Sequence, residues 1–455
     1  MLRPSYNLRN TSAPVPVRRK LVSPRQTFVM APPHALPATG AGYGDRAVLT
    51  GISWVFTLFL LVRLVLTDPV MNGFINYSDE GGSLIEKIHP ATYGIIGLLV
   101  LTLFRVQVTL SIAEFRLIKT MLGLIGVIFG LTIFLTMIGR SVSMGYLLET
   151  YIGACLAAIL LVLLPQEKRQ MIGEVLVVFV MVNALLAIAE KAAGARLLPY
   201  PYEELSFRPT ALTSHPLSIG LLHAGTVVFV LATRWRALFK AGAIGLIVLG
   251  TFAAGARTGS IFTGAAAIIA LMVTTMPGAS AESRFRLKAL LLGSLLLIGP
   301  LLLLGANEAG FLERFHGGYF DENAQARVDV YQVFDWVTTN EILFGSDLLA
   351  IKKMVFERLG ILVESSVVVF VFQFGLFGAV LFMAAIFWVF YRLAAAGDRR
   401  AFIGSVAFLA VALSNDAMSG KHPILMVMFL MLIAFRRGGV DAFGRPISLK
   451  WGEKS

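Results

Sequence analysis

The stretch from Val367 to Phe390 reads VVVFVFQFGLFGAVLFMAAIFWVF and contains no charged residue. As an α-helix it is long enough to cross the hydrocarbon core of a bilayer, which is about 30 Å thick. Apolar runs of roughly 15 to 25 residues recur from Ala47 to Phe435. A membrane β-barrel would instead need short segments of alternating polarity. We therefore expect an all-α polytopic integral membrane protein.

The composition of the chain agrees with this fold class. Hydrophobic residues make up 57% and charged residues 15% of the 455 residues, and the mean hydropathy is +0.77. Soluble domains carry about 25% charged residues, so this composition excludes a soluble enzyme. The single cysteine, Cys155, lies within an apolar run, and its being alone excludes an intrachain disulfide.

Breaks at charged residues and at Pro/Gly clusters divide the apolar sequence into about twelve transmembrane helices. We expect them near residues 47–67, 91–104, 120–139, 144–164, 171–190, 216–232, 240–255, 259–276, 289–305, 364–390, 401–414 and 422–435. An even number of spans places both termini on one side of the membrane. We expect that side to be the cytoplasm.

The distribution of charge supports this topology. If both termini are cytoplasmic, the inner segments hold about 26 of the 39 Lys and Arg residues and the outer segments about 12, with Arg63 inside the first span. By the same count about 18 of the 27 acidic residues lie outside. The net charge of +12 therefore reflects a basic inner face, and nucleic acid is not needed to explain it.

The sequence predicts three regions along the chain. Residues 1–46 combine several arginines with repeated prolines and are expected to form a disordered, basic cytoplasmic tail. Residues 47–435 form the membrane domain, and residues 436–455 form a cytoplasmic C-terminal tail. No apolar run occurs in the first 30 residues or so, and we therefore expect the first span to be a start-transfer anchor rather than a cleaved signal peptide.

Polar residues outside the spans concentrate in three outer segments, at residues 191–215, 256–259 and 306–363. The third segment is long for a compact protein and alternates aromatic with charged residues. We expect it to fold as a small helical cap in the extracytoplasmic space. Within it, the spacing from Arg327 to Trp336 predicts an amphipathic helix with Arg327 and Tyr331 on one face.

Arg257 is the only charged residue between Ala241 and Met276. A single helix over that stretch would be about 54 Å long, far beyond the thickness of a bilayer. Two helices must therefore meet near residues 256–259, which places the guanidinium group at the outer membrane boundary. There Arg257 either anchors a helix end by snorkelling or clamps an anion, because a guanidinium group matches a phosphate with two hydrogen bonds.

A second candidate segment runs from Arg208 to His215-Pro216 and leads directly into a span. One interpretation is helix initiation, with the proline in the first turn and a preceding hydroxyl side chain as the cap. The alternative is that Arg208 and His215 provide further donors at the same face as Arg257. Several cations near the lipid boundary would suit a diphosphate headgroup.

Other titratable residues lie in or beside the long loop. Glu364, at the mouth of a span, either marks the boundary or orients or deprotonates a substrate. Arg314 and His316 add a cation and a competing base. Glu149 lies near a span end, where it can reach the interface. No spacing of His, Asp and Glu resembles a metal site, so we expect neither a protein-bound metal nor a cofactor.

This arrangement resembles the superfamily of O-antigen polymerases and O-antigen ligases, bacterial enzymes of glycan assembly. The resemblance covers roughly residues 47–435 and rests on the order of several short motifs. These are Arg208 with His215-Pro216, Ala256-Arg257-Thr258-Gly259, Arg314-Phe315, Ala326-Arg327 with Tyr331, Gly345, Glu364-Ser365 and Phe374-Gly375-Leu376-Phe377-Gly378. Ligases typically carry a His-Asn pair where the long loop enters the next span. Glu364-Ser365 stands there in this chain, which is similar to the polymerase branch and particularly to exopolysaccharide polymerases.

The resemblance implies a metal-independent glycosyltransferase in the bacterial inner membrane, with its active site facing the periplasm. Such an enzyme polymerises undecaprenyl-diphosphate-linked oligosaccharide repeat units into a surface polysaccharide, and the lipid carrier is part of its substrate. Carried over by position, the substrate-binding residues are Arg208, His215, Arg257, Arg314, Arg327 and Tyr331, and the catalytic candidates are Glu364 and His316. The implied partners are membrane lipid, the lipid-linked oligosaccharide, a flippase and a chain-length regulator.

Two other functions remain open. An O-antigen ligase would transfer finished lipid-linked polymer to an acceptor such as lipid A core. A polysaccharide or lipid-linked sugar transporter would show inverted repeats, discontinuous spans and ionisable groups near the middle of the bilayer. Most ionisable groups of this chain fall instead at the outer face, which favours an enzyme.

Overall fold

The computed structural model describes residues 43–78, 83, 85–106, 110–139, 144–200, 207–273 and 322–436, with a few isolated positions between residues 282 and 308. All regular elements in these ranges are helices, so the predicted all-α fold class is confirmed for them. Nearly all of both predicted tails lies outside the described residues, as does most of the predicted span at 289–305.

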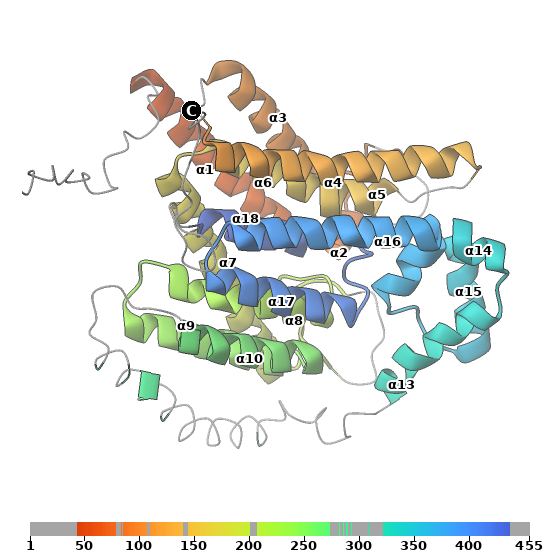
Figure 1. Cartoon of the computed structure of the whole chain (residues 1–455). Helices are drawn as coiled ribbons and strands as arrows, with labels where there is room; N and C mark the ends of the chain where they lie inside the picture. The colour runs from red at the N-terminus through yellow and green to blue at the C-terminus, as the bar shows by residue number, and fades with distance from the viewer. Residues whose placement is uncertain are drawn as a thin grey trace, which may run out of the picture. The chain divides into compact units, whose positions relative to one another are not determined.

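Helices of three types follow one another along the chain, of which Figure 1 labels the α-helices. They are α1 (Tyr43–Val65), α2 (Asp68–Asn72), α3 (Pro90–Arg105), α4 (Ile112–Met137), α5 (Met144–Tyr146), the π-helix η1 (Leu147–Ile152), α6 (Gly153–Leu163), α7 (Gln166–Ala193), α8 (Pro216–Thr226), the 3₁₀ helix η2 (Val227–Ala232), α9 (Ala237–Ala253), α10 (Arg257–Val273), α13 (Glu322–Asp329), the 3₁₀ helix η3 (Val330–Asp335), α14 (Thr339–Phe344), α15 (Leu348–Leu359), α16 (Ser366–Ala395), α17 (Arg399–Leu413) and α18 (Ile424–Ala434). Because α1 begins at Tyr43, the tail boundary predicted at residue 46 falls inside this helix.

Within the described residues, four helices are long and apolar enough to cross a membrane by length and composition. They are Ala47–Val65 of α1, Ile112–Met137, Gln166–Ala193 and Ser366–Ala395. Shorter apolar helices of 10–17 residues coincide with the other predicted spans in the described ranges, apart from the 15-residue α17. These helices indicate a membrane-embedded protein. The total of about twelve spans and the orientation of the chain stay predictions.

Burial follows the position of each helix in the bundle. The six buried side chains of α4 recur every three or four residues from Leu117 to Leu135, so that one stripe of this helix faces the protein. Phe134 and Met137 lie on its exposed surface, where contact with lipid is expected. By contrast, α18 is buried along its whole length and packs against α6, α7 and α8. Cys155 on α6 is also fully buried.

At one end of the bundle, hydrogen bonds tie together helix ends that are far apart in the sequence; we call this the polar end. Four bonds show the pattern: His89 Nε2 to the Leu66 carbonyl (3.1 Å), Thr150 Oγ1 to the Gly420 carbonyl (2.6 Å), His422 Nδ1 to Ser214 Oγ (2.9 Å) and Ser366 Oγ to the Asn415 carbonyl (2.8 Å). They join segments that the predicted topology places on the outer face.

A second set of contacts joins the helix ends that lie at the other end of the bundle. Arg169 at the start of α7 forms an ion pair with Glu114 at the start of α4 (2.5 Å). Gln166 donates to the carbonyl of Arg436 (3.1 Å), and Arg436 donates to the carbonyl of Ala396 after α16 (3.1 Å). The helices therefore alternate in direction along the described chain, as the predicted spans require.

The long helix α16 is interrupted at Gly375, which has φ 71° and ψ 164°. At this break α14 comes very close, and a Cβ atom on Gly375 would lie 2.2 Å from the carbonyl oxygen of Leu343. The N–H of Ser346 donates to the carbonyl of Phe372 beside it (2.7 Å). Only glycine satisfies both the positive φ and the close approach. The break therefore allows α14 to pack closely against α16 (Figure 1).

The described part of the long loop before α16, residues 322–363, is largely helical as predicted, and we refer to it as the cap. Its core is formed by apolar side chains of the cap and of α16: Val330, Val333, Ile351, Val355, Val363, Val368, Val369 and Phe372. The segment from Arg327 to Asp335 is helical, as predicted, but it changes helix type part-way. α13 ends at Asp329, and the chain continues as the tighter 3₁₀ helix η3, an arrangement common at helix ends.

Candidate functional site

The loop that carries Arg208 is fixed by Glu190 in the last turn of α7. The Glu190 carboxylate accepts hydrogen bonds from the backbone N–H groups of Leu197 (2.7 Å), Thr210 (2.9 Å) and Ala211 (2.8 Å). Hydrogen bonds to a charged acceptor are among the stronger ones in proteins. They hold the turn at Ala211, whose φ of 47° is unusual for a residue other than glycine. The sequence alone did not indicate this role.

Arg208 joins this loop to the turn between α9 and α10. Its Nε lies 3.5 Å from the carbonyl oxygen of Ala254, three residues before Arg257. Its own carbonyl accepts a hydrogen bond from Nε of Arg196 (3.0 Å), and the Arg196 guanidinium stacks over the ring of Tyr200 at 4.0 Å. Arg208 is therefore held between two segments that the sequence analysis had singled out separately.

Arg257 begins α10, and the predicted meeting of two helices at this point is confirmed. α9 ends at Ala253, and Gly255 makes the turn with a φ of 63°. Within the first turn of α10, Gly259 packs directly against α8, because its missing Cβ would lie 2.5 Å from the Cα of Gly220. This contact holds the N-terminal parts of α8 and α10 side by side. The start of α10 therefore lies next to the helix that begins after His215.

Helix initiation with Pro216 in the first turn is confirmed, but the prediction of a hydroxyl cap was wrong, because His215 is the residue that caps α8. Its Nδ1 accepts the N–H of Leu217 (3.2 Å). Burial, together with nearby cations of which Arg208 is the first and Arg327 another, lowers the pKa of the imidazole to about 3. The ring is therefore neutral at physiological pH, and the use of Nδ1 as an acceptor places its proton on Nε2.

The cap brings two further predicted residues to the entrance of α16. Arg327 forms an ion pair with Glu364 at 3.8 Å, and the two side chains remain 31% and 38% exposed. The hydroxyl of Tyr331 lies 3.4 Å from Oγ of Ser365, which caps α16. Both cap side chains therefore meet the Glu364-Ser365 motif. This pair of contacts agrees with the prediction that Arg327 and Tyr331 share one face.

Several residues predicted from the sequence thus converge at the polar end. The electrostatic influence of Arg208 and Arg327 on His215 connects the loop before α8 with the cap. Glu364 joins this group through its ion pair with Arg327, and Tyr331 joins it through its contact with Ser365. Arg257 lies nearby because α10 packs on α8. Arg314 and His316 lie outside the described residues.

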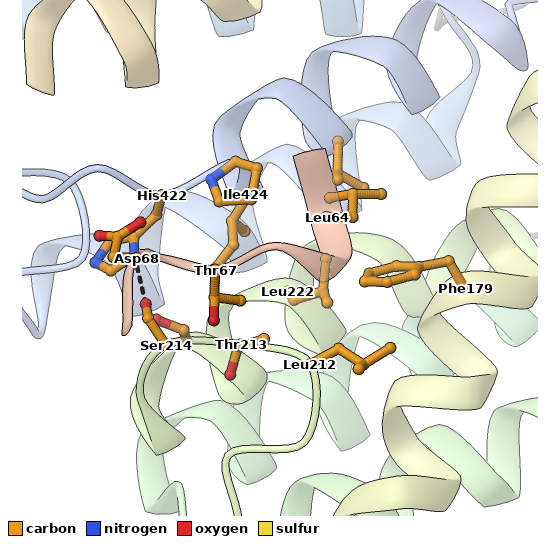
Figure 2. A pocket seen from close by; sticks show the side chains of 13 residues that line it. Leu64, Thr67, Asp68, Phe179, Leu212, Thr213, Ser214, Leu222, His422 and Ile424 are labelled. Carbon is orange, nitrogen blue, oxygen red and sulfur yellow. Dashed lines mark hydrogen bonds between the residues drawn. The ribbon is translucent and has the colours of Figure 1, made fainter. Parts of the chain in front are cut away.

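A small cavity of about 20 Å³ adjoins this region (Figure 2). Polar groups reach it from three parts of the chain: Thr67 and Asp68 after α1, Thr213 and Ser214 before α8, and His422 before α18. Ser214 and His422 are hydrogen-bonded to each other. Its size matches one or two water molecules. The sequence analysis did not anticipate this cavity, because its lining comes from segments that only the fold brings together.

Beneath the polar end lies a buried polar network around Glu149. Its carboxylate pairs with Arg63 (3.1 Å) and accepts hydrogen bonds from the His89 N–H (2.7 Å) and the Thr92 hydroxyl (3.1 Å). Arg63 also donates to the Tyr77 hydroxyl (3.2 Å). The expectation that Glu149 reaches the membrane interface was wrong. η1 is a π-helix, and Glu149 within it is fully enclosed by protein.

Two further charged residues border this network. Burial raises the pKa of Asp68 to about 7, although Arg63 and Lys421 oppose the shift. Burial also lowers the pKa of Lys421 to about 8. The Lys421 ammonium group lies 4.3 Å from the ring centre of Tyr77 and donates to the carbonyl of Lys87 (3.0 Å). This network ties the segment before α18 to the segment before α3.

Comparison of the chain with protein-family models, with curated proteins and with solved structures gives no match. The chemistry of the site must therefore be argued from its own residues. Arginine side chains are suited to a polyanion with several oxygens, and the Arg327–Glu364 pair is partly exposed to solvent. Among the described residues, no group of three or more His, Cys, Asp or Glu side chains is arranged to hold a metal ion.

Proposed function

We propose that this protein is a membrane glycosyltransferase that polymerises undecaprenyl-diphosphate-linked oligosaccharide repeat units into a surface polysaccharide. The observation that carries the proposal is the gathering of Arg208, His215, Arg327 and Glu364 at one end of a bundle of apolar helices. Three different parts of the sequence supply these residues. Each part contains one of the motifs on which the resemblance to O-antigen polymerases rests.

The arginines suit the diphosphate of the lipid carrier. In the proposed reaction the anomeric C–O bond to the diphosphate breaks, and negative charge develops on the leaving oxygen. Guanidinium groups at fixed positions stabilise that charge more in the transition state than in the ground state. Arg208 and Arg257 are anchored on the membrane helices, whereas Arg327 comes from the cap. A lipid-linked diphosphate at the membrane boundary would lie between these elements.

The second half of the reaction concerns the acceptor. A hydroxyl group of the next repeat unit attacks the anomeric carbon, and the activated lipid supplies the energy. Glu364 pairs with Arg327, a proposed diphosphate-binding residue, and this pairing supports a role for the carboxylate in receiving the acceptor hydroxyl. Tyr331 and His215 would provide hydrogen-bonding groups for sugar hydroxyls nearby. His316 stays a competing candidate for the base.

The location follows from the same reasoning. Lipid-linked repeat units are polymerised at the outer face of the bacterial inner membrane, and the proposed topology places the polar end on that face. Both termini would then be cytoplasmic. A flippase would have to deliver the repeat units, and a chain-length regulator would set the product size.

The proposal can be tested in a deletion strain by resolving lipid-linked intermediates and surface polymer by size. The deletion is complemented with wild type, with Arg257→Ala and with Arg358→Ala as a matched control, because Arg358 stacks on Trp336 in the cap. We expect single repeat units in the deletion and in Arg257→Ala, and full-length polymer with wild type and the control. Long polymer stranded on its lipid carrier would instead indicate a ligase. Repeat units trapped in the cytoplasm, or an unchanged glycan, would overturn the proposal in favour of transport.

A further inference from the structure

The helix α15 of the cap has two apolar faces. One face packs into the cap core, where Ile351 and Val355 are buried. The other face carries Leu349 and Phe356, whose side chains are 57% and 58% exposed. These two residues are seven positions apart, so they lie within about 20° of each other around the helix axis. They form an apolar stripe on the outside of the cap, which a membrane or a partner can cover.

Two lysines flank this stripe. Lys352 and Lys353 are both exposed, and they lie about 50° to either side of the line through Leu349 and Phe356. Glu357 lies further round the helix, where its carboxylate is 3.8 Å from the Lys353 ammonium group. Lysine stems cover apolar surface while their charged ends reach outward. Apolar side chains with lysines at both edges are typical of a helix that lies in the surface of a membrane with anionic lipids.

The start of α15 is fixed close to the expected lipid-facing surface of α16. Ser346, two residues before α15, donates its N–H to the carbonyl of Phe372 (2.7 Å), beside the break at Gly375. Every residue of α16 up to this break is buried or half-buried, whereas its exposed apolar surface begins directly after the break and includes Phe377. Since α16 is long and apolar enough to cross a membrane, that surface is expected to face lipid. The first turn of α15 therefore lies near the level at which the hydrocarbon core ends.

We propose that the outer face of α15 rests on the membrane surface. Leu349 and Phe356 enter the boundary between headgroups and acyl chains, and Lys352 and Lys353 bind the phosphate groups of anionic lipids. The partner of this surface is thus lipid with a negatively charged headgroup, because the lysines at the edges of the stripe complement that charge. The inference goes beyond the proposed reaction and does not depend on it.

This contact would also affect the part of the cap that carries Arg327. Ile351 and Val355 of α15 share the cap core with Val330 and Val333 of η3. η3 in turn follows directly on α13, the helix of Arg327. Because packed side chains connect α15 with η3, a membrane contact of α15 would fix the height of Arg327 above the bilayer.

The test uses the full-length protein reconstituted in lipid nanodiscs, with a photoreactive benzophenone amino acid in place of Phe356. The matched control carries the same group in place of Glu357, which is also exposed but lies about 100° further round the helix. In discs that contain phosphatidylglycerol, illumination should give about ten times more lipid adduct at the first position than at the second, because only the stripe faces acyl chains. Mass spectrometry of the illuminated protein measures both yields.

A second comparison tests the role of the lysines. Replacing Lys352 and Lys353 by glutamine removes an attraction worth about fivefold in lipid occupancy for each lysine. The yield of lipid adduct at Phe356 should therefore fall in the charged discs and stay unchanged in discs of phosphatidylcholine alone. A yield in the charged discs that does not respond to the loss of both lysines would overturn the assignment to anionic lipid.

Two other results would overturn the proposal. Equal yields of lipid adduct at Phe356 and Glu357 would show that the stripe does not face the membrane. Illumination of intact cells that gives a protein adduct at Phe356 in place of a lipid adduct would mean that the stripe docks another protein. Size-exclusion elution checks that each variant is folded. Should the Phe356 variant be unfolded, the same group at Leu349 decides, with the exposed neighbour Ala350 as its control position.

Discussion

Arg63 and Glu149, 86 residues apart in the chain, form an ion pair of 3.1 Å in which both side chains are fully enclosed. The pair joins α1 to the π-helix η1, and Glu149 completes its hydrogen bonds with His89 and Thr92. A charge inside an apolar protein is costly unless a partner and further hydrogen bonds compensate it. Here the partners come from three separate segments, so the pair fixes how these segments pack.

Replacing Glu149 by alanine should strongly destabilise the fold. The change leaves the Arg63 guanidinium buried without its carboxylate and removes an acceptor from the His89 N–H. Loss of one partner of a buried ion pair typically costs about 3–5 kcal/mol. Thermal unfolding in detergent would measure the effect, with Glu357→Ala as the control because Glu357 pairs with Lys353 on the exposed side of α15. Equal unfolding midpoints for the two variants would contradict the assignment.

Gly375→Ala should detach the cap from α16. A methyl group there would overlap with the Leu343 carbonyl, and the positive φ is itself unfavourable for alanine. We expect the cap to become susceptible to limited proteolysis while the bundle persists. Gly123→Ala in α4 is the control, because nothing lies within 4 Å of its Cβ position and alanine favours a helix there. A cap that remains protease-resistant in Gly375→Ala would show that the break in α16 is not required.

Two substitutions of Arg327 should show how much of its effect on kcat comes from its positive charge and how much from its hydrogen-bonding geometry. Arg327→Ala removes a cation from the proposed diphosphate site and should lower kcat for elongation by about 100- to 1,000-fold. Arg327→Lys keeps the charge but loses the two-pronged hydrogen-bonding geometry, so we expect an intermediate loss. The measurement is the initial rate with purified protein and a lipid-linked repeat unit. A lysine variant as slow as the alanine variant would mean that geometry alone matters, and two unimpaired variants would remove Arg327 from the site.

The pKa of Asp68 predicts a dependence of stability on pH. In the folded protein this pKa is about 7, whereas an aspartate in an unfolded chain titrates near 3.9. Between these values the folded protein binds a proton that the unfolded chain has already released. This contribution to stability is therefore present below about pH 4 and is lost as the pH rises to about 7. Unfolding midpoints measured across this window should fall less steeply for Asp68→Asn than for wild type. If the unfolding midpoint changed with pH in the same way in both proteins, the raised pKa of Asp68 would be refuted.

Removing the carboxylate of Glu190 should affect the site without unfolding the protein. Glu190→Gln keeps one acceptor oxygen but loses the charge that holds three backbone N–H groups of the loop before α8. We expect faster amide hydrogen exchange at Thr210 and Ala211 and a raised KM for the lipid-linked donor, because Arg208 is less well positioned. Glu167→Gln at the opposite end of α7 serves as the control. Exchange rates equal to those of wild type would exclude this role.

Helix positions could be predicted from the sequence because apolar runs and charged breaks are local properties. The turn at Arg257 is the clearest example: one charge in a long apolar stretch required two helices, and α10 begins at that residue. The motifs around Arg208, His215, Arg327 and Glu364 also come together, since alternating helices return the chain to the same end. In the cap, local spacing did not indicate the change from α13 to the 3₁₀ helix η3, whose Val330 and Val333 belong to the cap core.

The pairing of distant residues could not be predicted. Nothing in the sequence near Arg63 points to Glu149, and Glu149 in a regular helix near a span end would have been expected at the surface. Glu190 acts through backbone groups of a loop that carries no charge pattern of its own. Such contacts depend on the three-dimensional path of the chain.

Because Cys155 is buried, the topology of the wild-type chain can be mapped by labelling cysteines introduced at the surface. A thiol enclosed on all sides by α6 and its neighbours should be inert to maleimide reagents until the protein unfolds. Single cysteines introduced at exposed positions such as Asp347 in the cap and Arg116 near the opposite end of the bundle would then be the reactive thiols of the described chain. Labelling of intact cells with a membrane-impermeant reagent would assign each end of the bundle to one side of the membrane without first removing a native residue.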